Sequence, residues 1–183
     1  GAVQIFSADG AVQRGLYSEL GDVEMAYGNL DADPAYEIAC GSSTGAFTCT
    51  QYGGKRAFEF PNFGFGVRET LMADVSGDGR DELLIASETG YVYVLDGSGN
   101  VLAKRDFGSV VADLCVLSVP KRTKPVIALC CEDGQVYVMD GQGRLFGAAS
   151  TGASNRLVVS LPGHPSGARI LVATATDIVC LQL

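Results

Sequence analysis

Short apolar segments alternate with turn-forming residues along the whole chain, and residues 70–107 show the pattern best. In that stretch the expected strands are Thr70–Ala73, Glu82–Ser87, Tyr91–Leu95 and Val101–Phe107, and the expected turns are Thr89-Gly90 and Asp96–Gly99. Segments of this length joined by glycine-containing turns indicate antiparallel hairpins. The strand 91–95 is apolar on both faces, which is typical of a sheet buried between two neighbouring sheets.

The same pattern recurs along the chain with a nearly constant period. Equivalent hairpins are anchored at Gly1, Gly45, Gly90, Gly134 and Asp177, with spacings of 44, 45, 44 and 43 residues. Four-stranded antiparallel units of about 44 residues, packed face to face, predict an all-β fold of the β-propeller class with four tandem blades. A β-sandwich accounts for the short strands but not for the period.

The expected organisation is a single propeller domain or propeller segment over residues 1–183. Its blades are expected at 1–17 (partial), 23–63, 66–107, 111–150 and 156–183 (partial). These blades contain 17 strands, one more than a closed four-bladed ring needs, because the chain begins and stops at the same place in the repeat. An open arc leaves two apolar blade faces in water, which soluble monomers avoid. We therefore expect further blades, from the same or another chain, to complete a larger ring.

One loop between two strands carries the pattern of a calcium site. Oxygen-bearing side chains occupy its positions 1, 3, 5 and 9, a main-chain carbonyl is available at position 7, and glycine stands at position 6. The corresponding residues are Asp74, Ser76, Asp78, Glu82, Arg80 and Gly79. Ca²⁺ takes six to eight oxygen ligands, which alternate residues of a tightly curled loop can supply. The alternative interpretation is a solvated acidic turn.

The equivalent loop one period earlier carries a degraded version of this pattern. Its expected ligands are Asn29, Asp31, Asp33, the carbonyl of Ala35, and Glu37. Proline replaces glycine at position 6 and fixes φ near −65°, so a weak Ca²⁺ site and a relic both remain open. The corresponding loops around 118–124 and 161–167 lack the ligand pattern, and the first of them carries cations instead.

The motif Phe63-Gly-Phe-Gly66, followed by the acidic loop and the apolar strand that ends at Ser87, resembles the FG-GAP repeat of integrin-α-type propellers. The resemblance implies Ca²⁺ loops on one face of the propeller. It also implies a recognition or cell-adhesion scaffold that binds a protein or a glycan, without naming the ligand.

A second set of residues shares the repeat period. Glu24, Glu69, Asp113 and Arg156 are spaced by 45, 44 and 43 residues, at the start of the innermost strand of successive blades. They are therefore expected to meet around one mouth of the central channel. Paired carboxylates at such a mouth suit glycoside chemistry, so a carbohydrate-active enzyme is the alternative function. A hydrated charged rim is the simpler interpretation, and a structural subunit of a larger assembly is a third; enzymatic activity stays uncertain, and a binding role is favoured.

The charge and composition of the chain limit the classes of partner that it is expected to bind. The chain has 13 basic and 21 acidic residues, a formal net charge of −8, which argues against nucleic-acid binding. It contains no run of about 20 apolar residues, so no membrane span is expected. The single histidine, His164, has no neighbours at zinc-ligand spacing and no indication of a catalytic triad.

The six cysteines leave the compartment open. Cys40 and Cys49 lie directly opposite each other if Thr44-Gly45 is a two-residue turn, as two buried thiols or as a cross-strand disulfide. Cys130 and Cys131 are neighbours in one strand, so their side chains are expected on opposite faces. Scattered cysteines favour a reducing compartment, whereas Ca²⁺ loops favour an extracellular or cell-surface location.

Overall fold

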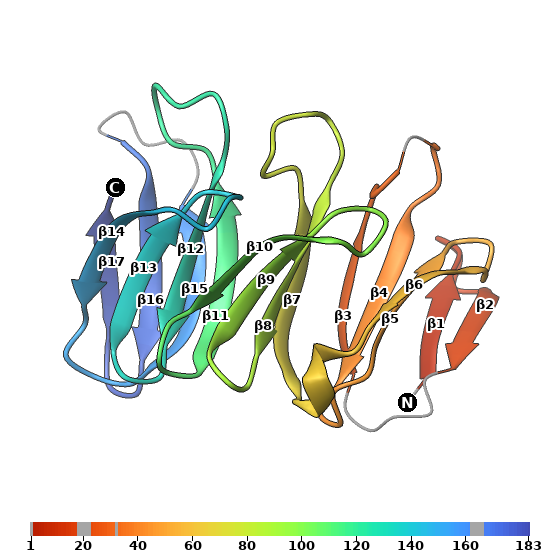
Figure 1. The fold of residues 1–183 in the computed structure, drawn as a ribbon, viewed down its shortest axis with the longest axis horizontal. Helices are drawn as coiled ribbons and strands as arrows, with labels where there is room; N and C mark the ends of the chain where they lie inside the picture. The colour runs from red at the N-terminus through yellow and green to blue at the C-terminus, as the bar shows by residue number, and fades with distance from the viewer. Residues whose placement is uncertain (1, 18–22, 32, 162–166) are drawn as a thin grey trace.

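The computed structural model describes residues 2–17, 23–31, 33–161 and 167–183. These residues form 17 strands in five antiparallel sheets, with a single three-residue 3-10 helix, η1 (Asn62–Gly64). Figure 1 shows the sheets following one another in chain order, from the red hairpin at the right to the blue strands at the left. No helix among the described residues has the length and apolar character needed to cross a membrane.

Each sheet is built from consecutive strands. The first contains β1 (Ala2–Phe6) and β2 (Val12–Tyr17); the second contains β3 (Val23–Gly28), β4 (Glu37–Ser42), β5 (Phe47–Gln51) and β6 (Arg56–Phe60). The third contains β7 (Val67–Ala73), β8 (Glu82–Ser87), β9 (Tyr91–Leu95) and β10 (Val101–Asp106). The fourth contains β11 (Val111–Leu117), β12 (Val126–Cys131), β13 (Gln135–Met139) and β14 (Leu145–Ser150). The fifth contains β15 (Asn155–Leu161), β16 (Arg169–Thr174) and β17 (Ile178–Gln182).

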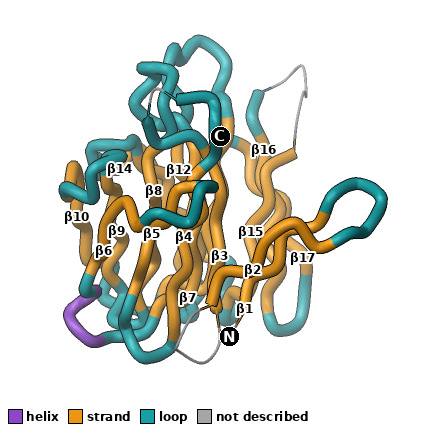
Figure 2. Tube along the Cα trace, turned by 90° about the vertical axis from the view of Figure 1, so that its right-hand side faces the viewer, coloured by secondary structure: helices purple, strands orange, loops and turns teal. Residues whose placement is uncertain are grey.

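This architecture confirms the all-β propeller class. The innermost strands β3, β7, β11 and β15 pack against one another in sequence, and the other strands of each sheet lie progressively farther out (Figure 2). The expectation of four equal blades is met only in part. Three of the described sheets have four strands, and they are flanked by one sheet of two strands and one of three.

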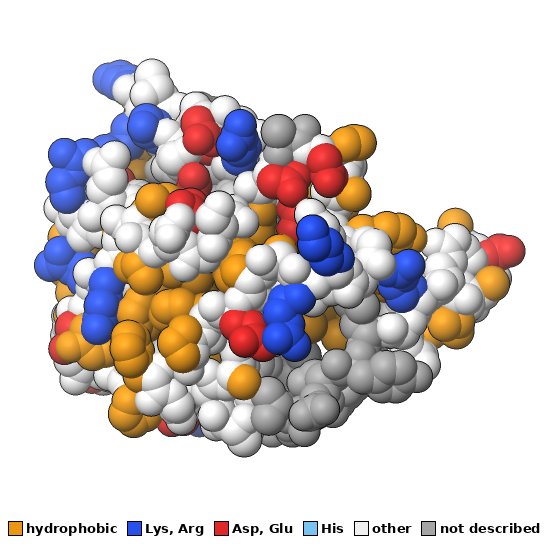
Figure 3. All heavy atoms as spheres, turned by 45° about the vertical axis from the view of Figure 1, so that its right-hand side comes forward, with side chains coloured by type: hydrophobic (Ala, Val, Ile, Leu, Met, Phe, Trp, Pro, Cys, Tyr) orange, Lys and Arg blue, Asp and Glu red, His pale blue; other side chains and the backbone are white. Residues whose placement is uncertain are grey.

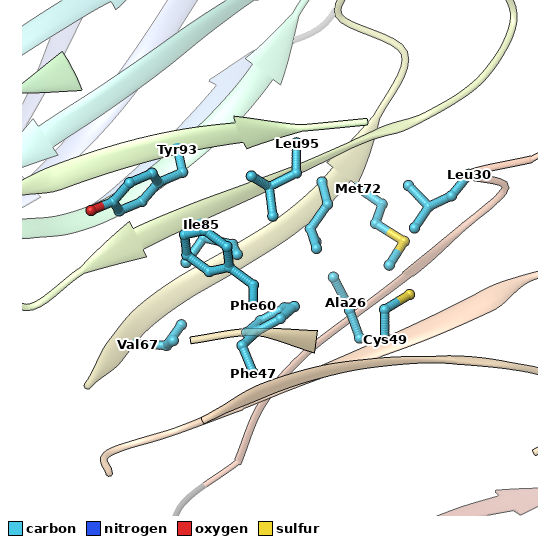
Figure 4. Close-up of a cluster of buried hydrophobic side chains, with 12 residues drawn as sticks. Ala26, Leu30, Phe47, Cys49, Phe60, Val67, Met72, Ile85, Tyr93 and Leu95 are labelled. Atoms are coloured by element: carbon cyan, nitrogen blue, oxygen red, sulfur yellow. The ribbon is translucent and has the colours of Figure 1, made fainter. Parts of the chain in front are cut away.

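The core consists of three apolar layers, one between each pair of successive sheets from the second to the fifth. Figure 4 shows the layer between the second and third sheets, where Phe47 and Phe60 face Ile85, Tyr93 and Leu95. Phe60 and Tyr93 meet edge to face, with ring centroids 5.0 Å apart. Each fully buried aliphatic side chain in such a layer stabilises the fold by about 1.5–3 kcal/mol.

Burial along the second strand of each sheet distinguishes inner sheets from the terminal one. All six residues of β8 and all six of β12 are buried, because a sheet covers each of their faces. In β16 burial alternates, with Ile170, Val172 and Thr174 buried and the residues between them partly exposed. The uncovered face has apolar side chains on all three strands of the fifth sheet, with Arg169 and Gln182 at one end. The apolar residues are Leu157, Val159, Leu171, Ala173, Ile178 and Cys180.

The opposite end of the row also has an incomplete cover. Met25 and Tyr27 on the innermost strand β3 are 48% and 69% exposed. The first sheet, which lies beside the second at this end of the row, has only two strands, and Tyr52 reaches it through a 3.1 Å hydrogen bond to Gln13. Figure 3 shows apolar side chains gathered in a patch among charged ones on the face turned toward the viewer. The described residues therefore form an arc with two incompletely covered end faces.

The hairpins at the repeat anchors are one residue longer than the sequence suggested. Ser42 pairs through its N–H with the carbonyl of Ala46, and Gly45 donates to Ser42, which leaves a three-residue loop. Cys49 is consequently opposite Ala39, and Cys40 is opposite Thr48. The predicted direct Cys40–Cys49 pairing is wrong, because a shift of one residue moves a side chain to the other face of a strand. Both thiols are free.

The anchor glycines are required for two reasons. Gly45, Gly90 and Gly134 have φ of 86°, 88° and 87°, in the left-handed region that favours glycine. In addition, the segment leading to the next sheet crosses directly over each of them. A Cβ on Gly90 would lie 2.6 Å from the Ser109 carbonyl oxygen, and one on Gly134 would lie 2.8 Å from that of Ala153. The glycines that recur with the sequence period therefore lie where the segment linking one sheet to the next crosses a hairpin.

Candidate functional site

The loop Asp74–Glu82 connects β7 and β8 at one edge of the propeller. Asp74 accepts hydrogen bonds from three backbone N–H groups of its own loop: Gly77 at 2.6 Å, Asp78 at 3.1 Å and Gly79 at 2.9 Å. Asp78 accepts from the Arg80 N–H at 3.0 Å. Glu82 is buried and accepts from the N–H groups of Val75 and Ser76, both at 2.9 Å. The carboxylates of Asp74, Asp78 and Glu82 are therefore engaged by the backbone of their own loop, whereas Ser76 Oγ is buried without a hydrogen-bond partner.

The loop Asn29–Glu37, between β3 and β4, holds its acidic groups differently. Carboxylate oxygens of Asp31, Asp33 and Glu37 all lie within 4.8 Å of one another. Glu37 is 1% exposed, and its Oε2 accepts the Leu30 N–H at 2.8 Å, while its Oε1 is buried without a hydrogen-bond partner. The side-chain oxygen of Asn29 is also buried without a partner. Two orphaned oxygens beside two further carboxylates form a donor set that suits a hard cation.

The electrostatics of this loop agree with its geometry. Burial, and then the charges of Asp31 and Asp33, raise the pKa of Glu37 above its usual value. Burial likewise raises the pKa of Glu82, although the backbone N–H of Ser76 opposes that shift. A divalent cation among the three carboxylates of the first loop would offset the repulsion between them.

Proline at position 34 does not prevent the first loop from curling. The N–H groups of Asp33 and Ala35 donate to the carboxylates of Asp31 and Asp33, at 2.8 and 2.7 Å, and these contacts shape the turn.

The two loops also touch, because Asn29 donates to the Asp81 carboxylate and Asp81 donates to the Asn29 carbonyl, both at 2.8 Å. Sequence spacing identified both loops but gave no access to which oxygens are left without a partner.

The innermost strands bring acidic residues together at the other edge. The pKa of Glu69 is raised to about 7, mainly by burial and further by the negative charges of Asp113 and Glu24. Glu24, Glu69 and Asp113 occupy equivalent register positions, opposite Gly41, Ala86 and Cys130 of the neighbouring strands.

Asp113 has a structural role in this cluster. It is buried, and it accepts the N–H groups of Leu114 and Val158, both at 2.8 Å, so it ties β11 to β15. Burial raises its pKa.

Arg156 does not occupy the position predicted for it. Asn155 is opposite Thr174 and Leu157 is opposite Ala173, so Arg156 is an unpaired bulge residue. The residue equivalent to Asp113 in the fifth sheet is Leu157. The third and fourth sheets have the same bulge at Arg68 and Ala112, so Arg156 is equivalent to these residues. Its spacing of 43 residues from Asp113 is one short of the 44 residues that separate Glu69 from Asp113. The described mouth therefore combines three acids, without the predicted arginine in their ring.

The cysteines and the single histidine are the remaining residues that the sequence singled out. Cys130 and Cys131 lie in different apolar layers, as expected for neighbours in a strand. Burial raises the pKa of Cys49 to about 12, so this thiol is unreactive in the folded protein. His164 lies outside the described residues.

A hollow that the sequence did not predict lies at the loop 118–125, which lacks the oxygen pattern of the two acidic loops. The loop 118–125 between β11 and β12, together with the hairpin 140–144, borders a cavity of about 720 Å³. Lys121, Arg122 and Lys124 line it, and Arg122 stacks on Phe146 with its Cζ 3.6 Å from the ring centroid. The cations were visible in the sequence, but the hollow depends on the contact of two sheets.

Solved structures with the same fold share little sequence with this chain. The BBS1N chain in its complex with ARL6DN has a TM-score of 0.78 at 11% identity; the match covers 98% of this chain and 56% of that one. The computationally designed Ika4 protein has a TM-score of 0.71 at 13% identity, with 91% and 94% covered. A protein of unknown function from Bacteroides caccae has a TM-score of 0.62 at 15% identity, with 100% and 65% covered. This chain thus spans slightly more than half the length of BBS1N.

Sequence comparison identifies the type of propeller. No curated protein is recognisably similar to the chain in sequence. A family model does match, over residues 37–156, and it describes the lambda-carrageenase β-propeller domain. The FG-GAP resemblance is thereby supported only at the level of the β-propeller. The matched region extends from β4 to the start of β15 and includes all of the third and fourth sheets. The chain belongs to the lambda-carrageenase β-propeller domain family.

Proposed function

We propose that this chain is a calcium-stabilised propeller scaffold that recognises a glycan. The observation that carries the calcium part is the buried, unpartnered Oε1 of Glu37 beside the carboxylates of Asp31 and Asp33. A buried carboxylate oxygen without a partner is costly, and a bound cation would remove that cost. Asn29 and the carbonyl of Ala35 would complete the shell in this proposal.

The loop Asp74–Glu82 is proposed as a second calcium site. Its ligands would be Asp74, Ser76, Asp78 and Glu82 with the carbonyl of Arg80. Ser76 Oγ is buried without a partner and would be free to act as a ligand. The Asp74 carboxylate already accepts three backbone N–H groups, whereas each carboxylate of the first loop accepts one, so we expect this site to bind more weakly than the first.

The glycan part rests on the family. A carrageenase acts on a polysaccharide, and the chain belongs to the propeller family named for that enzyme. The fold alone is equally compatible with a protein ligand, since the BBS1N propeller was crystallised with the protein ARL6DN. We choose the glycan because the family match is a sequence relation, whereas the BBS1N likeness concerns the fold.

Further blades are part of the proposal. The apolar face of the fifth sheet and the exposed Met25 and Tyr27 would be covered by blades of the same polypeptide or of another chain. The recognition surface would then belong to a larger ring, to which this chain contributes an arc.

A second candidate function is carbohydrate-active catalysis at the acidic mouth. It is favoured by Glu69, whose pKa of about 7 suits a general acid near neutral pH. Glu24 or Asp113 would supply the second carboxylate. Loss of polysaccharide cleavage in Glu69→Gln with unchanged glycan binding would support this role, and full retained cleavage would exclude it.

The scaffold proposal is tested with one titration and one array. Calcium should raise the melting temperature of the chain, chelator should reverse the rise, and Asp33→Ala should remove most of it. Asp78→Ala is the matched control, because it removes one carboxylate from the second loop and should remove the smaller part. An array that presents glycans and protein fragments then identifies the ligand class. Binding to protein alone would overturn the glycan assignment, and a melting temperature indifferent to calcium would overturn the metal sites.

A further inference from the structure

The two acidic loops are bonded to each other across the contact between the second and third sheets. Asn29 and Asp81 exchange two hydrogen bonds, both of 2.8 Å: the Asn29 N–H donates to Asp81 Oδ2, and the Asp81 N–H donates to the Asn29 carbonyl. A Cβ on Gly28 would lie 2.5 Å from Asp81 Oδ2, so the carboxylate occupies space that a side chain at position 28 would need. Position 1 of the first loop is therefore tied to position 8 of the second.

A chain of hydrogen bonds continues from one proposed ligand set to the other. The Arg80 carbonyl, a proposed ligand of the second loop, belongs to the same planar peptide group as the Asp81 N–H. The Asn29 carbonyl, which accepts that N–H, shares its peptide group with the Leu30 N–H, which donates to Glu37 Oε2 at 2.8 Å. Two peptide groups thus connect a ligand carbonyl of one loop with a ligand carboxylate of the other.

Packing between sheets holds this chain of hydrogen bonds in place. Leu30 is 2% exposed, and a Cβ on Gly97 would lie 2.0 Å from the Leu30 carbonyl oxygen, so the hairpin of the third sheet contacts the first loop closely. The same contact recurs one sheet later, where a Cβ on Gly141 would lie 3.0 Å from the carbonyl oxygen of the buried Val75. Leu30 and Val75 both occupy position 2 of their loops. Each acidic loop is therefore packed against the next sheet at the same position.

Each loop also retains a buried oxygen without a hydrogen-bond partner. These oxygens are Glu37 Oε1 in the first loop and Ser76 Oγ in the second. The side-chain oxygen of Asn29 is a third, so the connection between the loops begins at a residue that is itself a proposed ligand. Because buried polar atoms of proteins normally have a partner, both loops have an oxygen available to a cation.

Direct repulsion between two bound ions would oppose any favourable coupling of the loops. Besides burial, the charges that raise the pKa of Glu37 are those of Asp31 and Asp33. For Glu82 the charge that acts in the same direction as burial is that of Asp78. Each buried glutamate thus responds to the acids of its own loop. The hydrogen bonds are therefore the principal connection between the two loops.

We infer that the two loops bind calcium cooperatively, with the hydrogen bonds between Asn29 and Asp81 carrying the coupling. The inference rests on the calcium sites of the proposed function and adds how each site regulates the other. An ion bound to the Arg80 carbonyl would polarise its peptide group and make the Asp81 N–H a stronger donor. This fixes Asn29, and the next hydrogen bond fixes Glu37. The other ion then meets ligands that are already ordered and binds more tightly, and the effect is equal in both directions.

The test is a calorimetric titration of the full chain with calcium alone. Asp33→Ala leaves the second loop to bind, and Asp78→Ala leaves the first. The coupling factor is the product of the two stepwise association constants of the wild type, divided by the product of the two single-loop constants. It should be about five, at the lower end of typical couplings between sites. When all three titrations are repeated with Asp81→Ala, which removes the acceptor of the Asn29 N–H, the factor should fall below about two.

Two control variants separate the hydrogen bond from the charge of Asp81. Asp81→Asn keeps a side-chain oxygen that can accept the Asn29 N–H, so the coupling factor should stay at about five. Asp106→Ala removes an equal charge from the last strand of the third sheet, where Asp106 accepts the Gly108 N–H, and should leave the factor unchanged as well. Loss of coupling in either control would show that charge carries it, and would overturn the role of the hydrogen bond.

The remaining outcomes separate this inference from the function on which it rests. A coupling factor of one or less in the wild type, or one that survives Asp81→Ala, would overturn the inference and leave the calcium scaffold intact. Binding of a single ion would also overturn it, and binding of none would overturn the calcium part of the proposed function. If Asp81→Ala fails to fold, amide exchange decides. In Asp78→Ala, calcium in the first loop should slow exchange of the Asp81 N–H by about fivefold, and unchanged exchange would overturn the coupling.

Discussion

Gly90 provides the most direct test of the contact between a hairpin and the segment that leads to the next sheet. Its φ of 88° alone would cost a residue with a side chain about 1–2 kcal/mol. A Cβ there would also lie 2.6 Å from the Ser109 carbonyl oxygen, which belongs to the segment that enters β11. Overpacking against backbone adds about 1–3 kcal/mol. We therefore expect Gly90→Ala to lower the free energy of unfolding by about 2–5 kcal/mol.

Gly108 provides the matched control for this effect. Its φ is 70°, and a Cβ there would meet nothing within 4 Å, so Gly108→Ala should cost only the backbone term. With a urea m-value of about 2 kcal/mol/M, the two variants should differ in midpoint by about 0.5–1.5 M. Gly134→Ala should behave like Gly90→Ala, because its Cβ would lie 2.8 Å from the Ala153 carbonyl oxygen. Equal midpoints for Gly90→Ala and Gly108→Ala would refute the crossing segment as the reason for the repeated glycine.

Further expectations concern the metal, the acidic mouth and the thiols. Calcium at one hundred times its Kd should stabilise the chain by about 2.7 kcal/mol, and Asp33→Ala should lose most of this in a thermal titration. The raised pKa of Glu69 means that its contribution to stability is fully present below pH 4.5 and is lost as the pH rises through about 7. Glu69→Gln should therefore gain stability relative to wild type over that range, by about 2 kcal/mol at pH 8, and parallel pH profiles of unfolding would contradict this. A thiol reagent should label the fully buried Cys49 only after unfolding; labelling of Cys49 in the folded protein would contradict its burial.

The fold was predictable because periodic glycines mark the same junction in successive sheets. Gly45, Gly90 and Gly134 are spaced by one sheet each, and their positive φ values confirm a turn at each glycine, although the loops are one residue longer than inferred. At the next anchor the residue is Asp177, which is not among the described residues with positive φ, so this position does not require glycine.

The details that escaped prediction all depend on single-residue offsets. The hairpin loop has three residues instead of two, and this separated Cys40 from Cys49. Arg156 was assigned one residue too early: it is the bulge residue equivalent to Arg68 and Ala112, and Leu157 occupies the ring position. Both offsets change which face a side chain occupies, and neither changes the spacing of residue types along the sequence.

The residues of the two acidic loops could be predicted from the sequence, but their burial and hydrogen-bond partners could not. Spacing pointed to both acidic loops, while only the structure distinguishes an Asp74 carboxylate engaged by three N–H groups from a Glu37 oxygen without a partner. The cationic hollow could not be found from sequence, since its walls come from two sheets.

The central claim is that this chain is an arc of a larger propeller, with apolar end faces that another blade must cover. Light scattering after gel filtration tests it most directly. We expect a particle heavier than one chain of 19.1 kDa, and two chains together would approach an eight-bladed ring. Leu157→Asp places a charge on the uncovered face and should cause dissociation or aggregation. A monodisperse 19.1 kDa particle that melts cooperatively, in wild type and in Leu157→Asp alike, would contradict it.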